Sequence, residues 1–336
     1  MMNYTGLDRP KKPGYFLFWK AMFVAICLFG IGFIYAAADF VDYNWRWEQV
    51  PQYFWLDKDL EIRSEAEGDL TKIEKTAAGY TIIIQDGNHE EVVNMPPDAN
   101  IFLMEGDYVY MGDTIGEYRV SKPGILLEAT YVTLKVSMLA IVLGIVVGII
   151  SGLMRISENP CLRWLSITYV ELIRGSPLLV QIFLWYFVAG SLINAMLDKI
   201  GLDPIPALWY GVFALAIFTG AYVAEIVRAG VQSVHRGQSE AARALGLSGP
   251  QAMRKVILPQ AFRRILPPLA GQFISLIKDS SLLGVIAVRE LTKATREVIS
   301  SSLMSYELWI SCTIMYLVLT FALSVAVQYL ERRAVR

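Results

Sequence analysis

The chain has 336 residues, of which 55% are hydrophobic and 18% charged, and its formal net charge is −1. A soluble domain is usually about 45–50% apolar and about 25% charged, so this composition indicates a membrane protein. The near-zero charge argues against a basic nucleic-acid-binding protein, and we expect no nucleic-acid partner. With only 3 cysteines and 2 histidines, a disulfide scaffold is excluded and no metal site is expected.

Long apolar runs dominate the sequence. A helix needs about 20 mostly apolar residues to span a bilayer, because lipid offers the backbone no hydrogen-bonding partner. The segments that meet this requirement are residues 15–38, 131–154, 177–197, 205–224, 265–288 and 308–330. One such run can be a buried helix of a soluble protein, but six of them predict an all-α polytopic membrane protein.

The first run, residues 15–38, has two interpretations. It follows Arg9, Lys11 and Lys12 and ends at Ala38, as the apolar part of a cleaved signal peptide does. That part of a signal peptide usually has about 7–15 residues, and this run is longer. We therefore expect a retained transmembrane helix, with cleavage as the alternative.

Residues 39–122 form an acidic segment between the first two runs. They hold 18 acidic and 7 basic residues, a local charge of −11. Residues 80–93 are typical of two strands with a hairpin turn at 86–88. Gly-Asp turns recur at 106–107 and 112–113. We predict a small β-rich domain that resembles lipoyl-type domains, and expect no attached cofactor because no lysine occupies the turns.

Basic residues indicate the orientation of the chain in the membrane. Residues 228–264 contain seven basic residues and one acid, Glu240. Further basic residues lie near the two chain ends: Arg9, Lys11, Lys12, Arg332, Arg333 and Arg336. With six spans, both termini and residues 228–264 fall on one side, which the positive-inside rule makes cytoplasmic. The acidic segment 39–122 is then extracytoplasmic, and the net charge is the sum of two opposite surfaces.

The connection at residues 239–259 carries the most specific pattern. A helix over 238–245 is predicted to stop at Gly246, and a second short helix is predicted from Gln251 to Pro259. Protruding helices of this kind suit a groove on another protein. A basic amphipathic loop that lies on lipid headgroups fits the same residues, so both interpretations remain open at this point.

The same connection resembles the EAA loop of ATP-binding cassette (ABC) importer permeases. The matching residues are Glu240-Ala241-Ala242, Gly246 and Leu258-Pro259, with Val256 where the family favours isoleucine. Four further stretches are similar to the polar amino acid branch of that family, the histidine, glutamine and arginine type: residues 171–181, 221–226, 273–282 and 329–333. The resemblance covers residues 124–333 and leaves 15–122 outside it.

The resemblance implies a MetI-like transmembrane core and a permease subunit of the bacterial inner membrane. Such a subunit is not an enzyme and carries no cofactor, because ATP and magnesium bind a cytoplasmic ATPase dimer. Its other partners are an extracytoplasmic amino-acid-binding protein, a second permease subunit (identical or paralogous) and membrane lipids. By the family's pattern, the ATPase-coupling residues are Glu240, Ala241, Ala242, Gly246, Leu258 and Pro259.

Polar residues inside the predicted spans are candidates for a substrate pathway, since ionisable groups at membrane depth are costly. Lys278 and Asp279 point about 100° apart on a helix, and their alternative role is an ion pair that serves assembly. Asp279 or Glu225 could accept the ammonium group of an amino acid, and Ser275 or Gln181 could bind its carboxylate. The full candidate set is Gln181, Tyr222, Glu225, Gln272, Ser275, Lys278, Asp279 and Ser281.

We therefore expect a permease that moves polar amino acids by alternating access and is coupled to a separate ATPase through its EAA loop. The alternatives are an ABC permease for another small solute, an ion-gradient-driven secondary transporter and a membrane-anchored sensor. The expected domains are a cytoplasmic N-terminus (1–14), an extra transmembrane helix (15–38), the extracytoplasmic β-rich domain (39–122) and the permease domain (124–333). The β-rich domain either docks a binding protein or is a structural insert.

Overall fold

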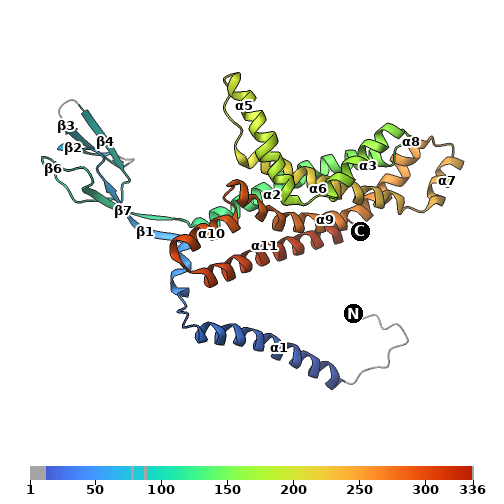
Figure 1. Cartoon of the computed structure of the whole chain (residues 1–336), viewed down its shortest axis with the longest axis horizontal. Helices are drawn as coiled ribbons and strands as arrows, with labels where there is room; N and C mark the ends of the chain where they lie inside the picture. The colour runs from blue at the N-terminus through green and yellow to red at the C-terminus, as the bar shows by residue number, and fades with distance from the viewer. Residues whose placement is uncertain (1–12, 77–78, 87–88, 335–336) are drawn as a thin grey trace. The chain divides into compact units, whose positions relative to one another are not determined.

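The computed structural model describes residues 13–76, 79–86 and 89–334. In the described residues a long helix is followed by a group of strands and then by helices up to the C-terminal end (Figure 1). The chain forms two compact units, Met1–Trp47 and Glu48–Arg336, and each is considered by itself. The basic residues at the chain ends that bear on orientation, Arg9, Lys11, Lys12 and Arg336, lie outside the described residues.

Within the described residues, six helical segments are long and apolar enough to cross a membrane, as predicted. Four are built mainly from one helix each: α1 (Pro13–Phe40), α2 (Ile125–Arg155), α6 (Ala207–Gln232) and α11 (Ser305–Ala334). The other two segments each join several elements. One consists of α4 (Leu178–Phe183), the π-helix η3 (Leu184–Gly190) and α5 (Ser191–Lys199). The other consists of α8 (Gly249–Ala252), the π-helix η4 (Met253–Ile257), α9 (Leu258–Asp279) and the 3-10 helix η5 (Ser280–Ile286). The predicted all-α polytopic fold is confirmed.

Helix α1 and the aromatic segment after it form the first unit. The side chains of α1 are mostly exposed within this unit, as expected of an apolar helix surrounded by lipid. After the helix, Trp45 stacks on Tyr35 with ring centroids 6.1 Å apart and on Trp47 at 5.7 Å. Tryptophan and tyrosine at the end of an apolar helix are typical of the membrane–water interface.

Helices α2 and α6 pack closely in the second unit. Gly144, Gly148 and Gly152 line the face of α2 that meets α6. A Cβ atom added to Gly148 would lie 2.4 Å from the Cβ of Val223, so only glycine fits at this contact. Small residues let membrane helices approach closely, and this stripe explains why α2 and α6 form a tight pair.

We expect Gly148→Ala to destabilise the protein, because overpacking a tight contact costs about 1–3 kcal/mol. Gly271→Ala is a matched control, since a Cβ at this helical glycine meets nothing within 4 Å. Alanine favours a helix by about 1 kcal/mol over glycine at both positions, so the difference between the variants isolates the packing cost. Thermal unfolding in detergent should give a lower Tm for Gly148→Ala, and equal Tm values would contradict the expectation.

Two shorter helices, α3 (Pro160–Arg174) and α10 (Leu291–Ser302), were not predicted. Asn159 caps α3, and its side chain accepts a backbone N–H at 2.9 Å. The carboxylate of Glu290 caps α10 and accepts two backbone N–H groups at 2.7 and 2.8 Å. Glu290 is buried, and this burial raises the pKa of its carboxyl group. Asparagine is a common N-cap residue, so the start of α3 has a local signal, whereas glutamate is not a preferred N-cap type.

The β-rich domain contains two antiparallel sheets. Its strands are β1 (Trp55–Arg63), β2 (Gly68–Thr76), β3 (Gly79–Asp86), β4 (His89–Met95), β5 (Asn100–Ile101), β6 (Tyr108–Val109) and β7 (Thr114–Pro123). The sheet orders are β1-β7-β5 and β4-β3-β2-β6. The core residues include Leu70, Ile82, Ile84, Met95, Val109 and Ile115. The predicted hairpin corresponds to β3 and β4, while Gly87 and Asn88 of its turn lie outside the described residues.

The two predicted Gly-Asp turns share one geometry. The carboxylate of Asp107 accepts the N–H of Met104 at 2.8 Å, and that of Asp113 accepts the N–H of Tyr110 at 2.9 Å. Each aspartate also donates its own N–H back to the same residue's carbonyl, at 3.1 and 3.0 Å. The aspartates therefore hold the backbone of these turns in place, as side chains of this type do in many turns.

Strands β1 and β7 form a two-stranded ribbon that leads to α2 (Figure 1). The indole N–H of Trp55 donates to the hydroxyl of Ser121 at 2.8 Å. The guanidinium of Arg119 donates to both carboxylate oxygens of Asp57, at 2.8 and 2.7 Å, and this bonding lowers the pKa of Asp57. The base of the ribbon packs into a cluster that includes Val50, Tyr53, Phe54, Leu126, Leu291, Leu308 and Cys312. The β-rich domain is therefore joined to α2, α10 and α11 by a braced connection.

Candidate functional site

The α6–α9 connection (residues 233–257) begins with helix α7 (Arg236–Ala244). His235 caps this helix, with its Nδ1 atom accepting the N–H of Gly237 at 3.1 Å. Ala242 is buried, whereas Glu240 and Ala241 are exposed. Helix α7 thus packs on the protein through Ala242 and leaves the side chain of Glu240 exposed.

Helix α7 ends in a turn centred on Gly246. The N–H of Gly246 donates to Arg243 O at 2.9 Å, and the N–H of Leu247 donates to Ala242 O at 3.1 Å. This pair of bonds is a Schellman motif, which requires a left-handed residue, and Gly246 has φ +80°. The turn leaves Leu245 83% exposed at the helix end. The helix stop predicted at Gly246 is therefore present.

The second half of the connection differs from the expectation. Ser248 and Gln251 form a capping box at the start of α8, and the helical path then continues through η4 into α9. The predicted helix end at Pro259 is wrong, because this proline lies in the first turn of α9, where its missing N–H is tolerated. The amide of Gln260 donates to the side chain of Gln238 at 3.0 Å and so ties α9 to α7.

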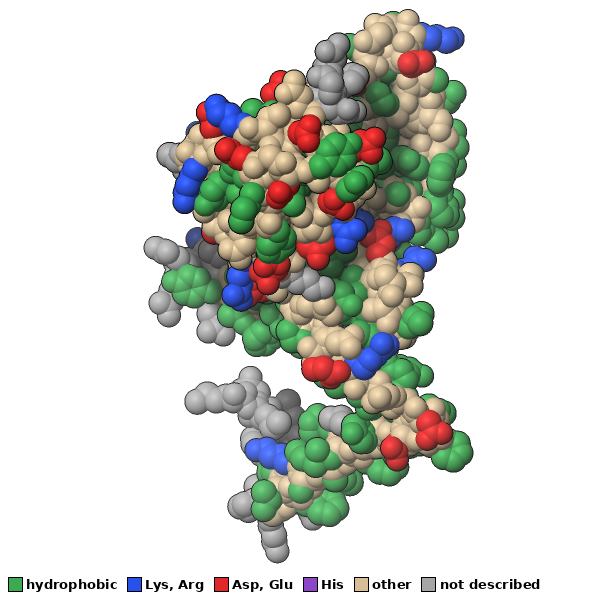
Figure 2. Space-filling view, turned by 90° about the vertical axis from the view of Figure 1, so that its left-hand side faces the viewer, with side chains coloured by type: hydrophobic (Ala, Val, Ile, Leu, Met, Phe, Trp, Pro, Cys, Tyr) green, Lys and Arg blue, Asp and Glu red, His purple; other side chains and the backbone are tan. Residues whose placement is uncertain are grey.

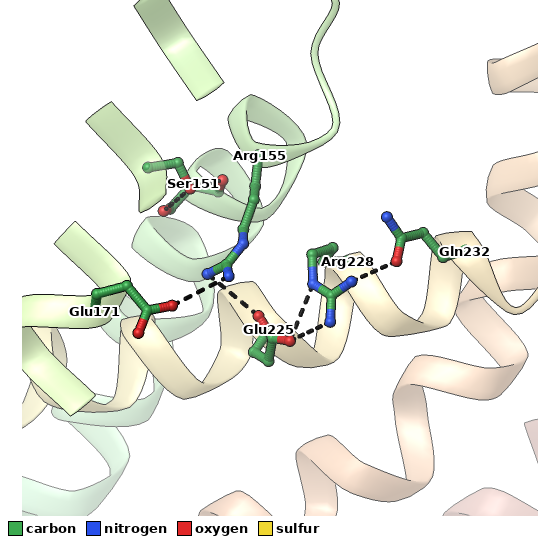
Figure 3. A network of polar contacts seen from close by, with 7 residues as sticks. Ser151, Arg155, Glu171, Glu225, Arg228 and Gln232 are labelled. Atoms are coloured by element: carbon green, nitrogen blue, oxygen red, sulfur yellow. Dashed lines mark hydrogen bonds and ion pairs between the residues drawn. The ribbon is translucent and has the colours of Figure 1, made fainter. Parts of the chain in front are cut away.

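A network of charged side chains joins α2, α3 and α6 (Figure 3). Arg155 lies 3.4 Å from a carboxylate oxygen of Glu171 and 3.3 Å from one of Glu225. Arg228 donates its Nε–H to Glu225 at 3.0 Å and also bonds Gln232. Glu225 therefore stands between two arginines, and its charge is compensated from both sides.

Beside this network lies a cavity of about 550 Å³ between α3, α6 and α9. Its lining consists of Arg174, Tyr222, Glu225, Ile226, Ala229, Gly230, Ser233, Arg264 and Pro268. The guanidinium of Arg174 lies 5.3 Å from the centroid of the Tyr222 ring, and Arg264 donates to the carbonyl of Ser233. In the part of the chain that is described, no group of three or more His, Cys, Asp and Glu residues could hold a metal. The lining suits a small organic ion.

Comparison with known proteins identifies the family. Residues 144–336 match the family described as "Binding-protein-dependent transport system inner membrane component". The chain belongs to this family. It is 44% identical to the probable glutamine ABC transporter permease protein GlnM of Bacillus subtilis over 207 residues, 62% of this chain and 92% of the relative. It is 39% identical to the glutamine transport system permease protein GlnP of Escherichia coli K12, again over 62% and 92%.

Comparison with solved structures supports the same family assignment. A crystal structure of an amino acid ABC transporter with histidines has a TM-score of 0.55 and 39% identity, over 62% of this chain and 94% of that chain. An inward-facing structure of the methionine ABC transporter MetNI has a TM-score of 0.53 at 20% identity and so supports the fold alone. The predicted MetI-like fold and the resemblance to ABC importer permeases are confirmed.

The candidate pathway residues of this permease do not form one site. Tyr222 and Glu225 line the cavity, as their shared helix face predicts. Gln181 is buried elsewhere, and its amide donates to Ile173 O at 2.7 Å and to Ser176 O at 3.1 Å. The amide of Gln181 therefore holds the junction between α3 and α4 together.

The other candidate residues lie near the C-terminal end of α9 and at the start of η5. Lys278 is exposed and Asp279 half-buried, and among the described residues neither forms an ion pair. Gln272 and Ser275 are half-buried, as is Ser281 in the 3-10 helix η5, where the α-helical spacing used for its prediction no longer holds. None of these residues lines the cavity.

Sequence reasoning missed the arginines that organise the site. Arg155 is not among the candidates predicted from the sequence, although it binds two carboxylates. The spacing of Glu225 and Arg228 at i and i+3 is a signal for a pair on one helix, and it was available in the sequence. The contact of Arg264 with Ser233 had no such signal, because the two residues lie on different helices or loops.

Proposed function

We propose that this protein is the permease subunit of an ABC importer that moves polar amino acids into the cell. The observation that carries the proposal is the projecting end of α7, with exposed Glu240 and Leu245 beside the Gly246 turn. A short exposed helix of this kind fits a groove on a partner, here the ATPase. The proposed coupling residues are Glu240, Ala241, Ala242, Gly246, Leu258 and Pro259. The substrate class is supported by the glutamine permeases among the relatives.

The position of α7 between two helices that line the cavity supports alternating access as the proposed mechanism. Gln260 of α9 is bonded to Gln238 of α7, and Arg264 of α9 is bonded to the carbonyl of Ser233 at the end of α6. A displacement of α7 by the ATPase would therefore be transmitted to both α6 and α9. Closing and opening of a cavity between packed helices is a common form of such two-state transitions.

The cavity lining supports an amino acid on its way to the cytoplasm. Arg174 lines the cavity, and within the described residues it has no ion pair or side-chain hydrogen bond, so it can donate to a substrate carboxylate. Glu225 is shared by two arginines, so its carboxylate is not the proposed acceptor inside the cavity. Asp279 lies outside the cavity, at the end of α9, and we assign it to a separate point of the pathway, where it accepts the ammonium group. The remaining members of the proposed pathway are Gln181, Tyr222, Gln272, Ser275, Lys278 and Ser281.

The proposal includes the partners that such an importer needs. A cytoplasmic ATPase dimer would hold ATP and magnesium, and an extracytoplasmic binding protein would deliver the amino acid. A second permease subunit, identical or paralogous, would complete the pathway in the inner membrane. The basic α6–α9 connection and both termini would face the cytoplasm, in agreement with the positive-inside rule.

Reconstitution tests this function. Proteoliposomes with the permease, its ATPase and its binding protein should take up labelled glutamine only when ATP is present on the ATPase side, and ionophores should have no effect. Uptake without ATP that ionophores abolish would favour a secondary transporter. ATP-driven uptake of a different solute, with no uptake of any amino acid, would keep the ABC mechanism and reject the substrate class.

A further inference from the structure

An exposed apolar patch lies on the β-rich domain, on the segment that links β5, β6 and β7. We define the β patch as Phe102, Met104, Tyr108, Tyr110 and Met111, which are 54%, 76%, 51%, 62% and 75% exposed. On the face of the molecule in Figure 2, hydrophobic side chains lie among acidic ones. Large exposed apolar patches rimmed by polar residues mark interaction sites.

The backbone under the β patch is held firmly. Asp107 and Asp113 fix its two turns. The N–H of Gly106 donates to Leu70 O at 2.8 Å, and the N–H of Gly112 donates to Ser64 O at 2.9 Å, so both turns are also tied to the segments around β2. The rings of Tyr108 and Tyr110 meet edge to face at 5.1 Å. A preorganised surface loses little conformational entropy on binding, as a docking surface should.

The net charge of the β-rich domain distinguishes between the kinds of partner that could cover the β patch. Residues 48–122, which contain the β-rich domain, carry 16 acidic and 6 basic residues. An anionic membrane surface would be repelled by this charge, and so would the same domain of a second copy of the chain. A soluble protein with a basic rim around an apolar centre would be attracted and steered to the patch. Of the three kinds of partner, only such a protein is electrostatically complementary.

We propose that the β patch is a docking surface for the extracytoplasmic substrate-binding protein, through a basic rim on that protein. The inference rests on the proposed function, because a binding protein is the soluble partner that an importer of this family requires. The braced ribbon of β1 and β7 connects the docking surface to α2, α10 and α11. Docking is thereby linked to helices of the permease core rather than to a flexible tether.

The test uses the complete permease–ATPase complex in nanodiscs and the binding protein that supports its uptake. In the variant Tyr110→Ser/Met111→Ser, the concentration of binding protein needed for half-maximal stimulation of ATP hydrolysis should rise about tenfold or more, as is typical when interface anchors are truncated. Val92→Ser is the matched control, since Val92 is 51% exposed but lies on β4, at the opposite edge of the sheet from β6. This control should behave like the unmodified complex.

Each of the other results of this experiment has a single interpretation. If the binding protein stimulates the variant and the unmodified complex at the same concentration, the docking inference is overturned. If the binding protein stimulates neither complex, the proposed function itself fails. Two further results concern other partners: the variant loses co-flotation with vesicles of phosphatidylglycerol and phosphatidylethanolamine, or it loses a self-association seen by light scattering, in each case without a change in stimulation. Either result would assign the patch to lipid or to a second copy and would overturn the inference.

Discussion

Replacing Gly246 with valine is expected to uncouple ATP hydrolysis from transport while the permease still inserts in the membrane. Gly246 has φ +80°, a conformation that is a strong outlier for a β-branched residue. The strain of about 1–2 kcal/mol would reduce the population of the intact turn by about 5–30-fold. Leu245 and Glu240 would then lose the positions in which they meet the ATPase. Transport in proteoliposomes should fall by a similar factor.

Gly246→Asn is the matched control for this expectation, because asparagine adopts the left-handed conformation more readily than other residues. A Cβ at position 246 meets nothing within 4 Å, so neither variant is disfavoured by a clash inside the subunit. Asparagine should therefore retain most of the transport that valine loses. Equal loss in both variants would mean that the ATPase surface excludes any side chain there. If both variants retained transport equally, the left-handed turn at Gly246 would not be required for coupling.

The membrane core of this protein could be predicted because its sequence signal is long and leaves few alternatives. Runs of about 20 apolar residues cannot remain in water, and this locates the spanning segments. The Gly246 turn could be predicted for a different reason: a Schellman motif depends on a few neighbouring residues. The same local rule misplaced a helix end at Pro259, because a proline in the first turn of a helix is compatible with it.

Helices α3 and α10 were missed because they are short and amphipathic, whereas membrane prediction depends on continuous apolar length. Asn159 followed by Pro160 is a helix-start signal that could have located α3, whereas the Glu290 cap of α10 is not a residue type that such signals include. The charge network is a different case. Arg155 and Glu225 are brought together only because α2 and α6 pack closely, and no local pattern reports that packing.

Replacing Glu225 with glutamine is expected to cost about 1–3 kcal/mol of unfolding free energy, between the values for exposed and for buried ion pairs. The substitution keeps the shape of the side chain but leaves Arg228 without a carboxylate and Arg155 with only the more exposed Glu171. Water replaces the lost partner only in part, because the side chains of Arg155, Glu225 and Arg228 are 16%, 24% and 29% exposed. Titration with a denaturing detergent would measure the loss.

Glu171→Gln is the control for this network, since it removes a carboxylate from the same arginine. Glu171 is 66% exposed and lies 3.4 Å from Arg155, so water can replace it and the loss should stay below about 1 kcal/mol. Equal losses in the two variants would show that Arg155, rather than the central position of Glu225, determines the stability of the network. A neutral Glu225→Gln would mean that the two arginines find other partners. In that case the carboxylate of Glu225 would again be a candidate acceptor for the ammonium group of the substrate.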